Sequence, residues 1–333
     1  MRRWAGRAAR ARPAGFSLLE LLLAAALGVL TTAALAQLFV SNARATALQT
    51  GQARLQESAR LALHFLADSA RSAGYFGCGP ANLADGLGGT WRGDPLHDLT
   101  MPVAGADDAG HADEARSWGL GNRELKPGSD IVLLRRIEGL GHDLAQPYHA
   151  AGDLVLASSF APEPGQLTVL SACGQLGVLG IETIARPSGR VTLAGSVDID
   201  ALAPAGFAYG DSAGPAATVL ATVVSEVYFV ARGRFVNNRG DPTWSLWRKA
   251  GRADEVVSGI DDLQVLYGID PTPNDADLAP RRYVTGDGIG AGIVRAVYFR
   301  VTASSVDAVG EEDRPLAQTV SQTVALRNPR VPI

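Results

Sequence analysis

The sequence is poor in the side chains that build metal and redox sites. Its 333 residues include only two cysteines, Cys78 and Cys173, and five histidines. No CxxC pair occurs, and no two histidines stand at the spacing of zinc ligands. These absences argue against a zinc module, and we expect no cofactor.

Nucleotide-binding motifs are missing as well. The chain has no Walker A sequence, and its glycine-rich stretch at residues 286–292 neither follows an expected strand nor opens an expected helix. We interpret this stretch as a flexible loop before the next strand. The pattern therefore argues against a phosphate-cradling site.

A serine hydrolase would lack its partners in this chain. Ser212 lies in GDSAG at residues 210–214, which matches the GxSxG nucleophile elbow. That elbow needs a buried strand before the serine, a helix after it and a later histidine, but residues 204–209 are broken by Pro and Gly and the last histidine is His149. We expect a turn here and no enzyme, with an exported hydrolase as the alternative to be tested.

What the sequence does contain is a long apolar run near its start. Residues 21–40 carry no formal charge, which is enough for about 30 Å of helix and one hydrocarbon thickness. Five arginines and no acid lie in residues 1–15, so the positive-inside bias places the N-terminus in the cytoplasm. Removing residues 1–15 would change the formal charge from −4 to −9. A mildly acidic chain gives no electrostatic reason to expect nucleic-acid binding.

Glu20 stands at the head of this run, where a carboxylate costs a few kcal/mol unless it finds a partner. If the chain is cut after Gly15, the new α-amino group of Phe16 lies one helical turn away, at the (i, i+4) spacing of opposite charges. The string GFSLLE followed by LLLAAALGVL resembles the class III signal of type IV pilins and pseudopilins. The resemblance implies that prepilin peptidase cuts between Gly15 and Phe16, that Phe16 is methylated, and that Glu20 orders subunits during assembly.

Later segments are similar to the PilW group of minor pilins. They lie at residues 54–60, 73–78, 258–270 and 324–328. This resemblance implies an inner-membrane precursor with a periplasmic head, which then enters a type IV pilus at the cell surface and helps to initiate its assembly near the tip. The implied partners are other minor pilins, the major pilin, prepilin peptidase and the inner-membrane assembly platform, with a tip adhesin as a further candidate.

Three alternatives stay open at this point. A conventional secretory signal would be cut before Gln37, after the small residues Ala34 and Ala36. A pseudopilin of a type II secretion system would share the leader and the helix. A tip adhesin that binds a host surface or DNA is a further possibility, although no basic patch with interleaved aromatics argues for DNA.

Two further sites are expected in the head. Across the membrane Cys78 and Cys173 would meet an oxidising compartment, where pairing is the default, and we expect a disulfide between them. The acidic loop after residue 269 offers oxygen ligands for calcium but departs from the EF-hand pattern, so a solvated turn is the preferred interpretation. The weak calcium candidates are Asp270, Asn274, Asp275 and Asp277.

The expected fold is of the α+β class, with one long N-terminal helix packed on an antiparallel sheet head. We divide the chain into a leader (1–15), a membrane or fibre-core helix (16–40), its amphipathic continuation (41–73) and a β-rich head (74–333). The continuation has a narrow apolar stripe at spacings of three and four: Leu48, Gln52, Leu55, Ala59, Ala62, Leu66 and Ala70. Strands are expected at residues 131–135, 154–158, 167–170, 181–185, 191–194, 218–230, 245–248, 260–267, 293–302 and 319–326.

Overall fold

The computed structural model divides the chain into two compact units, residues 1–50 and 51–333, and each is described by itself. The structure describes residues 15, 17–77, 82–85, 87, 89–109, 113–121, 123–139, 141–145, 154–157, 166–172, 175–185, 190–194, 218–271, 279–290, 292–310, 312 and 314–328. In the first unit, the described residues from Leu18 onward are all helical, and their side chains are exposed.

One helix, α1 (Leu18–Ser72), accounts for 55 residues and confirms the long N-terminal helix predicted from the sequence. It ends just before Gly74, which adopts φ +76°. A Cβ at this position would lie 1.9 Å from the carbonyl oxygen of Asn328, so both the backbone angle and the close approach require glycine.

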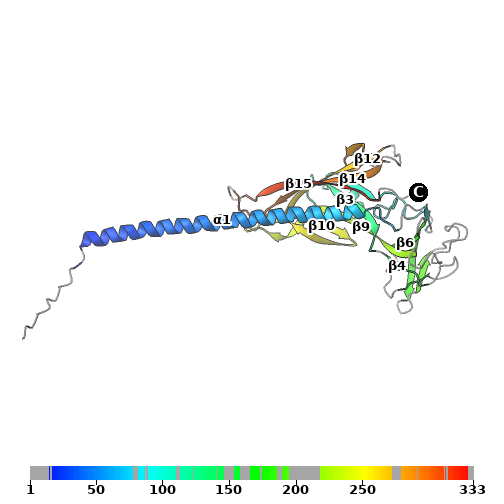
Figure 1. The fold of residues 1–333 in the computed structure, drawn as a ribbon, viewed down its shortest axis with the longest axis horizontal. Helices are drawn as coiled ribbons and strands as arrows, with labels where there is room; N and C mark the ends of the chain where they lie inside the picture. The colour runs from blue at the N-terminus through cyan, green and yellow to red at the C-terminus, as the bar shows by residue number, and fades with distance from the viewer. Residues whose placement is uncertain are drawn as a thin grey trace, which may run out of the picture. The chain divides into compact units, whose positions relative to one another are not determined.

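The second unit is a head made almost entirely of strands, which follow the C-terminal part of α1 (Figure 1). Its elements are β1 (Asn82–Asp85), β2 (Val103–Ala106), α2 (Asp113–Ser117), β3 (Ile131–Ile137), β4 (His142–Asp143), β5 (Leu154–Val155), β6 (Leu167–Ala172), β7 (Gln175–Ala185), β8 (Arg190–Ala194), β9 (Thr218–Val236), β10 (Pro242–Ala250), β11 (Arg252–Ser258), β12 (Ile260–Asp270), β13 (Arg282–Val284), the 3-10 turn η3 (Gly286–Gly288), β14 (Ile293–Ser304) and β15 (Ala317–Ala325).

These strands form two sheets. The larger has eleven strands, with the order β11-β10-β9-β6-β7-β8-β5 and with β1 paired to β7, β2 to β3, and both β3 and β4 to β9. The smaller has four strands in the order β13-β12-β14-β15. Among the strand pairs that the structure describes, β1 with β7 is parallel and the others are antiparallel. The α+β class predicted from the sequence is confirmed.

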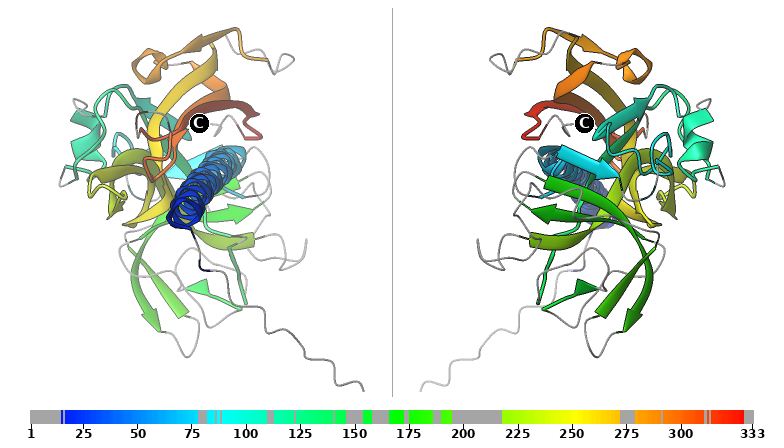
Figure 2. Two further views of the ribbon diagram at one scale, coloured as in Figure 1. Left: turned by 90° about the vertical axis from the view of Figure 1, so that its left-hand side faces the viewer. Right: turned by 90° about the vertical axis from the view of Figure 1, so that its right-hand side faces the viewer.

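The C-terminal part of α1 packs against both sheets, and Figure 2 shows it among the strands of the head. The predicted stripe is buried from Leu55 onward, whereas Leu48 and Gln52 are exposed. Its buried members share one hydrophobic core with Tyr228 and Leu246 of the larger sheet and with strands of the smaller one. Ser69 adds a hydrogen bond of 2.8 Å to the Tyr228 hydroxyl. The stripe therefore joins α1 to both sheets at once.

Gly259 is the point at which the chain passes from the larger sheet to the smaller. It separates β11 from β12 and adopts φ +72°. Its N–H donates to the carbonyl of Trp244 and its own carbonyl accepts from Ser304, at 3.0 and 2.8 Å. A Cβ would lie 2.5 Å from the Ser304 carbonyl oxygen. The position therefore requires a residue without a side chain.

Most strands predicted from the sequence are present. The two long strands β9 and β12 extend beyond their predicted ends, to Val236 and Asp270. Five strands, β1, β2, β4, β11 and β13, were not predicted from the sequence, because they are short or carry charges. Trp91 and Trp118, which lie in the loop-rich region between α1 and β3, are 3% and 4% exposed and anchor this region to the core.

Asp130 links the two sheets immediately before β3. Its N–H donates to the carbonyl of Leu263 and its Oδ2 accepts from the N–H of Val265, both at 2.8 Å. Burial raises the pKa of Asp130 to about 6, and the charges of Asp107 and Asp262 add to the rise. The hydrogen bond from Val265 opposes it. The link between the two sheets is therefore weaker when Asp130 is ionised than when it is protonated.

The Asp130 site predicts a pH dependence of stability. Because the folded-state pKa is raised, the folded protein binds more protons than the unfolded chain between pH 3.8 and about 6. The stabilisation is present at low pH and is lost as pH rises through that window, by at most about 3 kcal/mol. Asp130→Asn keeps an oxygen for Val265 but does not titrate. In urea unfolding of the detergent-solubilised protein, the free energy of unfolding of this variant relative to wild type should be higher at pH 7 than at pH 4.5.

The matched control is Asp254→Asn on the exposed surface of β11, where the side chain is 51% exposed. Its difference from wild type should change much less across the same pH range. Equal pH profiles for Asp130→Asn and wild type would contradict the assignment.

Candidate membrane and assembly surface

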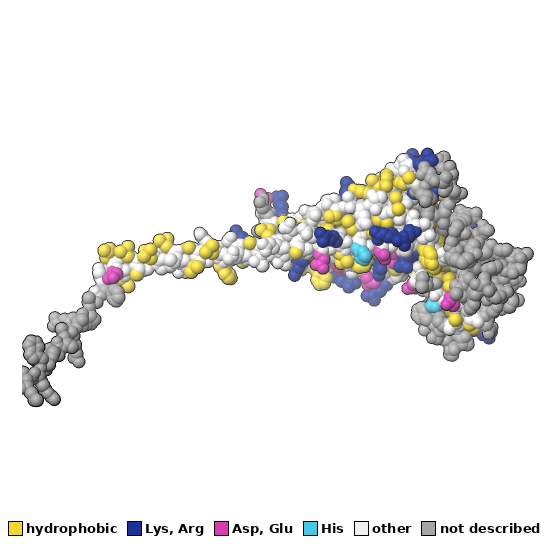
Figure 3. Space-filling view, viewed as in Figure 1, with side chains coloured by type: hydrophobic (Ala, Val, Ile, Leu, Met, Phe, Trp, Pro, Cys, Tyr) yellow, Lys and Arg dark blue, Asp and Glu magenta, His cyan; other side chains and the backbone are white. Residues whose placement is uncertain are grey.

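The N-terminal part of α1 exposes many large apolar side chains, which Figure 3 shows as hydrophobic groups along the helix. No charged residue occurs between Glu20 and Arg44. The exposed large side chains of this part are Leu18, Leu19, Leu21, Leu22, Leu23, Leu27, Val29, Leu30, Leu35, Leu38, Phe39 and Val40, with exposures of 49–77%. By length and composition, α1 contains a segment able to cross a membrane. In water a large apolar area would be exposed along this part of α1, so it requires lipid or other helices around it.

The hydroxyl groups within this part of α1 are satisfied by the helix itself. Thr31 Oγ1 lies 3.0 Å from the carbonyl oxygens of both Leu27 and Gly28, and Thr32 Oγ1 donates to Gly28 at 2.7 Å. Such bonds to the preceding turn leave no hydroxyl hydrogen without an acceptor in an apolar solvent. The two threonines are therefore compatible with a membrane span.

At the start of α1, the structure describes Gly15 of the predicted processing site and Glu20, the predicted assembly residue. Gly15 is exposed, and no atom lies within 4 Å of a Cβ built on it. Phe16 lies outside the described residues. Glu20 is exposed in the first turn of α1, where the partial positive charge of a helix N-terminus favours an acid.

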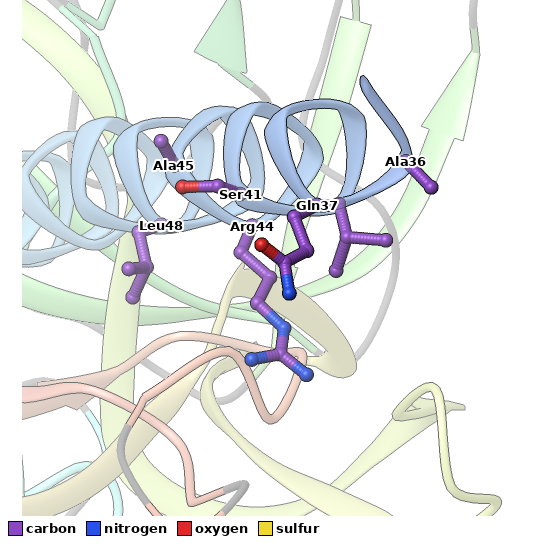
Figure 4. Close-up of a pocket in the computed structure, with 7 residues that line it drawn as sticks. Ala36, Gln37, Ser41, Arg44, Ala45 and Leu48 are labelled. Atoms are coloured by element: carbon purple, nitrogen blue, oxygen red, sulfur yellow. The ribbon is translucent and has the colours of Figure 1, made fainter. Parts of the chain in front are cut away.

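A shallow hollow of about 620 Å³ lies along one face of α1, where the apolar run ends and the next two turns begin (Figure 4). It is lined by Ala36, Gln37, Val40, Ser41, Arg44, Ala45 and Leu48. These residues form two rows at (i, i+4) spacing, so one helix face combines small side chains with the first cation after the run. Small residues let another helix approach closely.

Asp270, the first of the weak calcium candidates, is buried between two arginines. It is fully inaccessible, and its carboxylate oxygens lie 3.4 Å from Arg281 and 3.6 Å from Arg295. A carboxylate held by two guanidinium groups is a poor ligand for a cation. Asn274, Asp275 and Asp277 lie outside the described residues. Within the described part of the chain, no group of three or more His, Cys, Asp or Glu side chains could hold a metal ion.

The glycine-rich stretch has a packing role where it is described. Gly286 is buried at the start of η3, and its N–H donates to Asp107 Oδ1 at 2.9 Å. A Cβ at Gly286 would lie 2.6 Å from the backbone of Gly105 in β2. Gly286 therefore packs closely against β2. The start of the glycine-rich stretch is not the flexible loop that was predicted from the sequence. Ser212, Cys78 and Cys173 lie outside the described residues.

The buried charges that connect segments of the head were not predicted from the sequence. Arg135 is 2% exposed and donates to the carbonyls of Pro95, Leu96 and Met101, so it holds the turn before β2 against β3. Burial lowers the pKa of Arg135 to about 10, and the charges of Asp98 and Asp94 limit the fall. Glu226 is 2% exposed and accepts from Arg136 at 3.0 Å. These contacts join segments that are far apart in the sequence, and for that reason no local sequence pattern predicts them.

Comparison with known proteins gives one family match. A family model described as Type IV Pilus-assembly protein W matches residues 228–323, less than a third of the chain. The match supports a protein related to type IV pili. It runs from within β9 into β15 and includes residues 258–270, one of the segments that carried the resemblance, but not the processing motif. The comparisons with curated proteins and with solved structures returned no match.

The apolar surface predicts a strong response to a single charge. Leu30 lies in the middle of the run and is 65% exposed. Leu30→Arg should disfavour membrane insertion by about 2.5–3.5 kcal/mol, because an arginine at the centre of a membrane helix must be solvated at that cost. The measurement is the fraction of protein that resists alkaline extraction from membranes. Thr46→Arg, beyond Arg44, is the control and should insert as wild type does. Equal extraction of the two variants would show that residues 21–40 do not span the membrane.

Proposed function

We propose that this protein is a minor pilin of the PilW type, which takes part in initiating type IV pilus assembly near the pilus tip. The observation that carries the proposal is α1 itself, since it exposes a run without charged residues from residue 21 to residue 40, while one face of its C-terminal part is buried against a strand-built head. The family match over residues 228–323 supports the same assignment.

In this proposal the precursor sits in the inner membrane with its N-terminus in the cytoplasm and its head in the periplasm. Prepilin peptidase cuts between Gly15 and Phe16, a site that the exposure of Gly15 supports. The apolar part of α1 then moves from lipid into the fibre core, where it is surrounded by the helices of neighbouring pilins. The role is structural, and no catalytic residue is proposed.

Glu20 would act through electrostatics during this transfer. A carboxylate moved into an apolar core costs several kcal/mol unless an opposite charge accompanies it. The α-amino group created at Phe16, in the same subunit or in an adjacent one, supplies that charge. The acid would therefore favour only positions in the fibre at which a processed N-terminus is within reach.

A disulfide between Cys78 and Cys173 is part of the proposal. The support comes from their described neighbours, because a Cβ on Gly77 would lie 1.9 Å from Ser171 Oγ. Gly77 directly precedes Cys78, and Ser171 lies two residues before Cys173. The bond would close a long loop, which in the chain-entropy model stabilises the fold by about 4–5 kcal/mol.

The first test is the intact mass of the protein purified from its native membrane. We expect a chain that begins at Phe16, carries one methyl group and gains the mass of two hydrogens on reduction. Gly15→Leu should leave the uncut precursor, because the peptidase would meet a larger side chain at the cleavage site. A mature chain that begins at Gln37 would instead establish a secretory signal.

The second test is Glu20→Ala. Cleavage should remain close to the wild-type level while incorporation into pili is lost, because the variant inserts in the membrane but cannot pair with a processed N-terminus. Immunoblots of membranes and of sheared pili measure the two outcomes separately. Glu57→Ala, on the exposed surface of α1, is the matched control. Normal incorporation of Glu20→Ala would exclude the electrostatic mechanism.

A further inference from the structure

The smaller sheet ends at β15, and the proposed packing of α1 in the fibre does not involve this edge. β15 is nine residues long and pairs on one side with β14, from Ser304 opposite Ala317 to Ala296 opposite Ala325. In the described part of the chain, no strand pairs with its other side. Figure 1 shows β15 at the end of that sheet, beside β14.

The sequence of β15 has none of the features that usually protect an edge strand. Its residues, AQTVSQTVA, include no charge, proline or glycine. Natural edges are kept from pairing by charged side chains, prolines, bulges or short length. The register of β14 with β15 is continuous over all nine residues, without a bulge. Within the described part of the chain, β15 is therefore a regular edge strand whose outer side is paired with no other strand.

The other ends of the two strand orders are protected. β11 carries Arg252, Asp254 and Glu255 within seven residues. β5 and β13 are two and three residues long, and the side strands β1, β2 and β4 have four residues or fewer. Among these described edges, β15 is thus the longest, and unlike β11 it carries no charge.

The chemistry of this edge selects the kind of partner. In an antiparallel pair, every second residue turns its N–H and C=O away from the neighbouring strand, so β15 presents about four such donor and acceptor pairs. Another extended backbone satisfies them in register, whereas lipid cannot satisfy them and a polyanion would need cations that β15 lacks. The occupant is therefore a strand of a protein.

The symmetry of a second copy does not fit. Two identical β15 strands paired edge to edge in the antiparallel manner are related by a two-fold axis normal to the sheet. Because α1 packs on the core shared with this sheet, the rotation would reverse the direction of α1. Subunits that leave the same membrane all point the same way, so two copies cannot pair in this antiparallel manner, and a strand of a different protein is the occupant that we propose.

We propose that β15 accepts a strand from a different pilus subunit and so extends the four-stranded sheet into that neighbour. The inference rests on the proposed function for the identity of the neighbour. The side chains of β15 alternate: Val320 and Val324 pack against the core, whereas Thr319, Ser321 and Thr323 are exposed. A matching strand therefore alternates apolar and hydroxyl-bearing or amide residues and carries no charge facing β15.

The first measurement is hydrogen exchange of the full-length protein alone in detergent. The outward amides of β15 should exchange rapidly, while those of β14, which is paired on both sides, exchange slowly. Slow exchange throughout β15 would show that another part of this chain already covers the edge, and it would overturn the proposal.

The second measurement places a photo-crosslinking amino acid at Thr323 in the native, piliated strain. The expected product joins position 323 to an extended segment of a different pilus subunit, identified by sequencing the joined peptides. Adding Gln318→Lys and Ser321→Lys should abolish this product, because two charges at the edge disfavour pairing. The matched control carries the same two charges elsewhere, as Thr90→Lys and Ala250→Lys, both exposed, and should retain the product.

The outcomes separate the two proposals. A cross-link to another copy of this chain, or none at all in cells whose pili contain the cut protein, would overturn the edge proposal and leave the proposed function intact. An uncut protein that never appears in pili would overturn the proposed function, whereas the exchange of β15 would still report whether the edge is open.

Discussion

The packing of α1 onto the core of the head is the contact on which the rest of the structure depends. Its buried face consists mainly of alanines, including Ala59, Ala62 and Ala70, with Leu55 and Leu66 as the large side chains. Alanines allow the helix to lie close to both sheets, and each buried leucine contributes about 1.5–3 kcal/mol. The contact is narrow, so the other faces of α1 stay exposed. A helix held along one stripe can meet neighbours along the others.

Buried charges give the head its internal register. Asp270 lies between Arg281 and Arg295, and Glu226 accepts from Arg136, so each acid ties together strands that are distant in the sequence. Losing one partner of such a pair costs about 3–5 kcal/mol, because the other charge is left buried. A shift of either strand would also separate the paired charges and leave them buried alone, so these pairs add to the register that the apolar faces already specify. The sheet edges are thereby held in one fixed position.

The sequence allowed the helix, the α+β class and most strands to be predicted, and the reason is physical. A run without charge and a stripe at spacings of three and four are local patterns, and they persist in the fold. The short strand β2 and the charged strand β11 lack such patterns, because their neighbours supply the pairing. Asp270 was predicted to lie in a solvated turn, and its burial depends on Arg295, which comes from another strand.

The same limit applies to the surfaces. The apolar part of α1 can be predicted from the amino-acid sequence alone, because a chargeless run of this length is a local pattern. The free side of β15 cannot, since its residues are those of an ordinary strand. Whether a strand lies at an edge is decided by the order in which strands pair, and that order depends on contacts across the whole head. The candidate surfaces therefore differ in how far local sequence determines them.

The two surfaces also differ in what they can select. Apolar helix packing gains free energy roughly in proportion to buried area and is tolerant of the exact neighbour. Backbone pairing along β15 gains less per residue, yet it fixes direction and register, because a shift by one residue turns every partner side chain to the opposite face. In a subunit that carries both surfaces, helix packing can hold the subunit in the fibre, while pairing along β15 selects the neighbouring subunit. Affinity and choice of neighbour would then be set by separate parts of one chain, so that a change in either could occur without loss of the other.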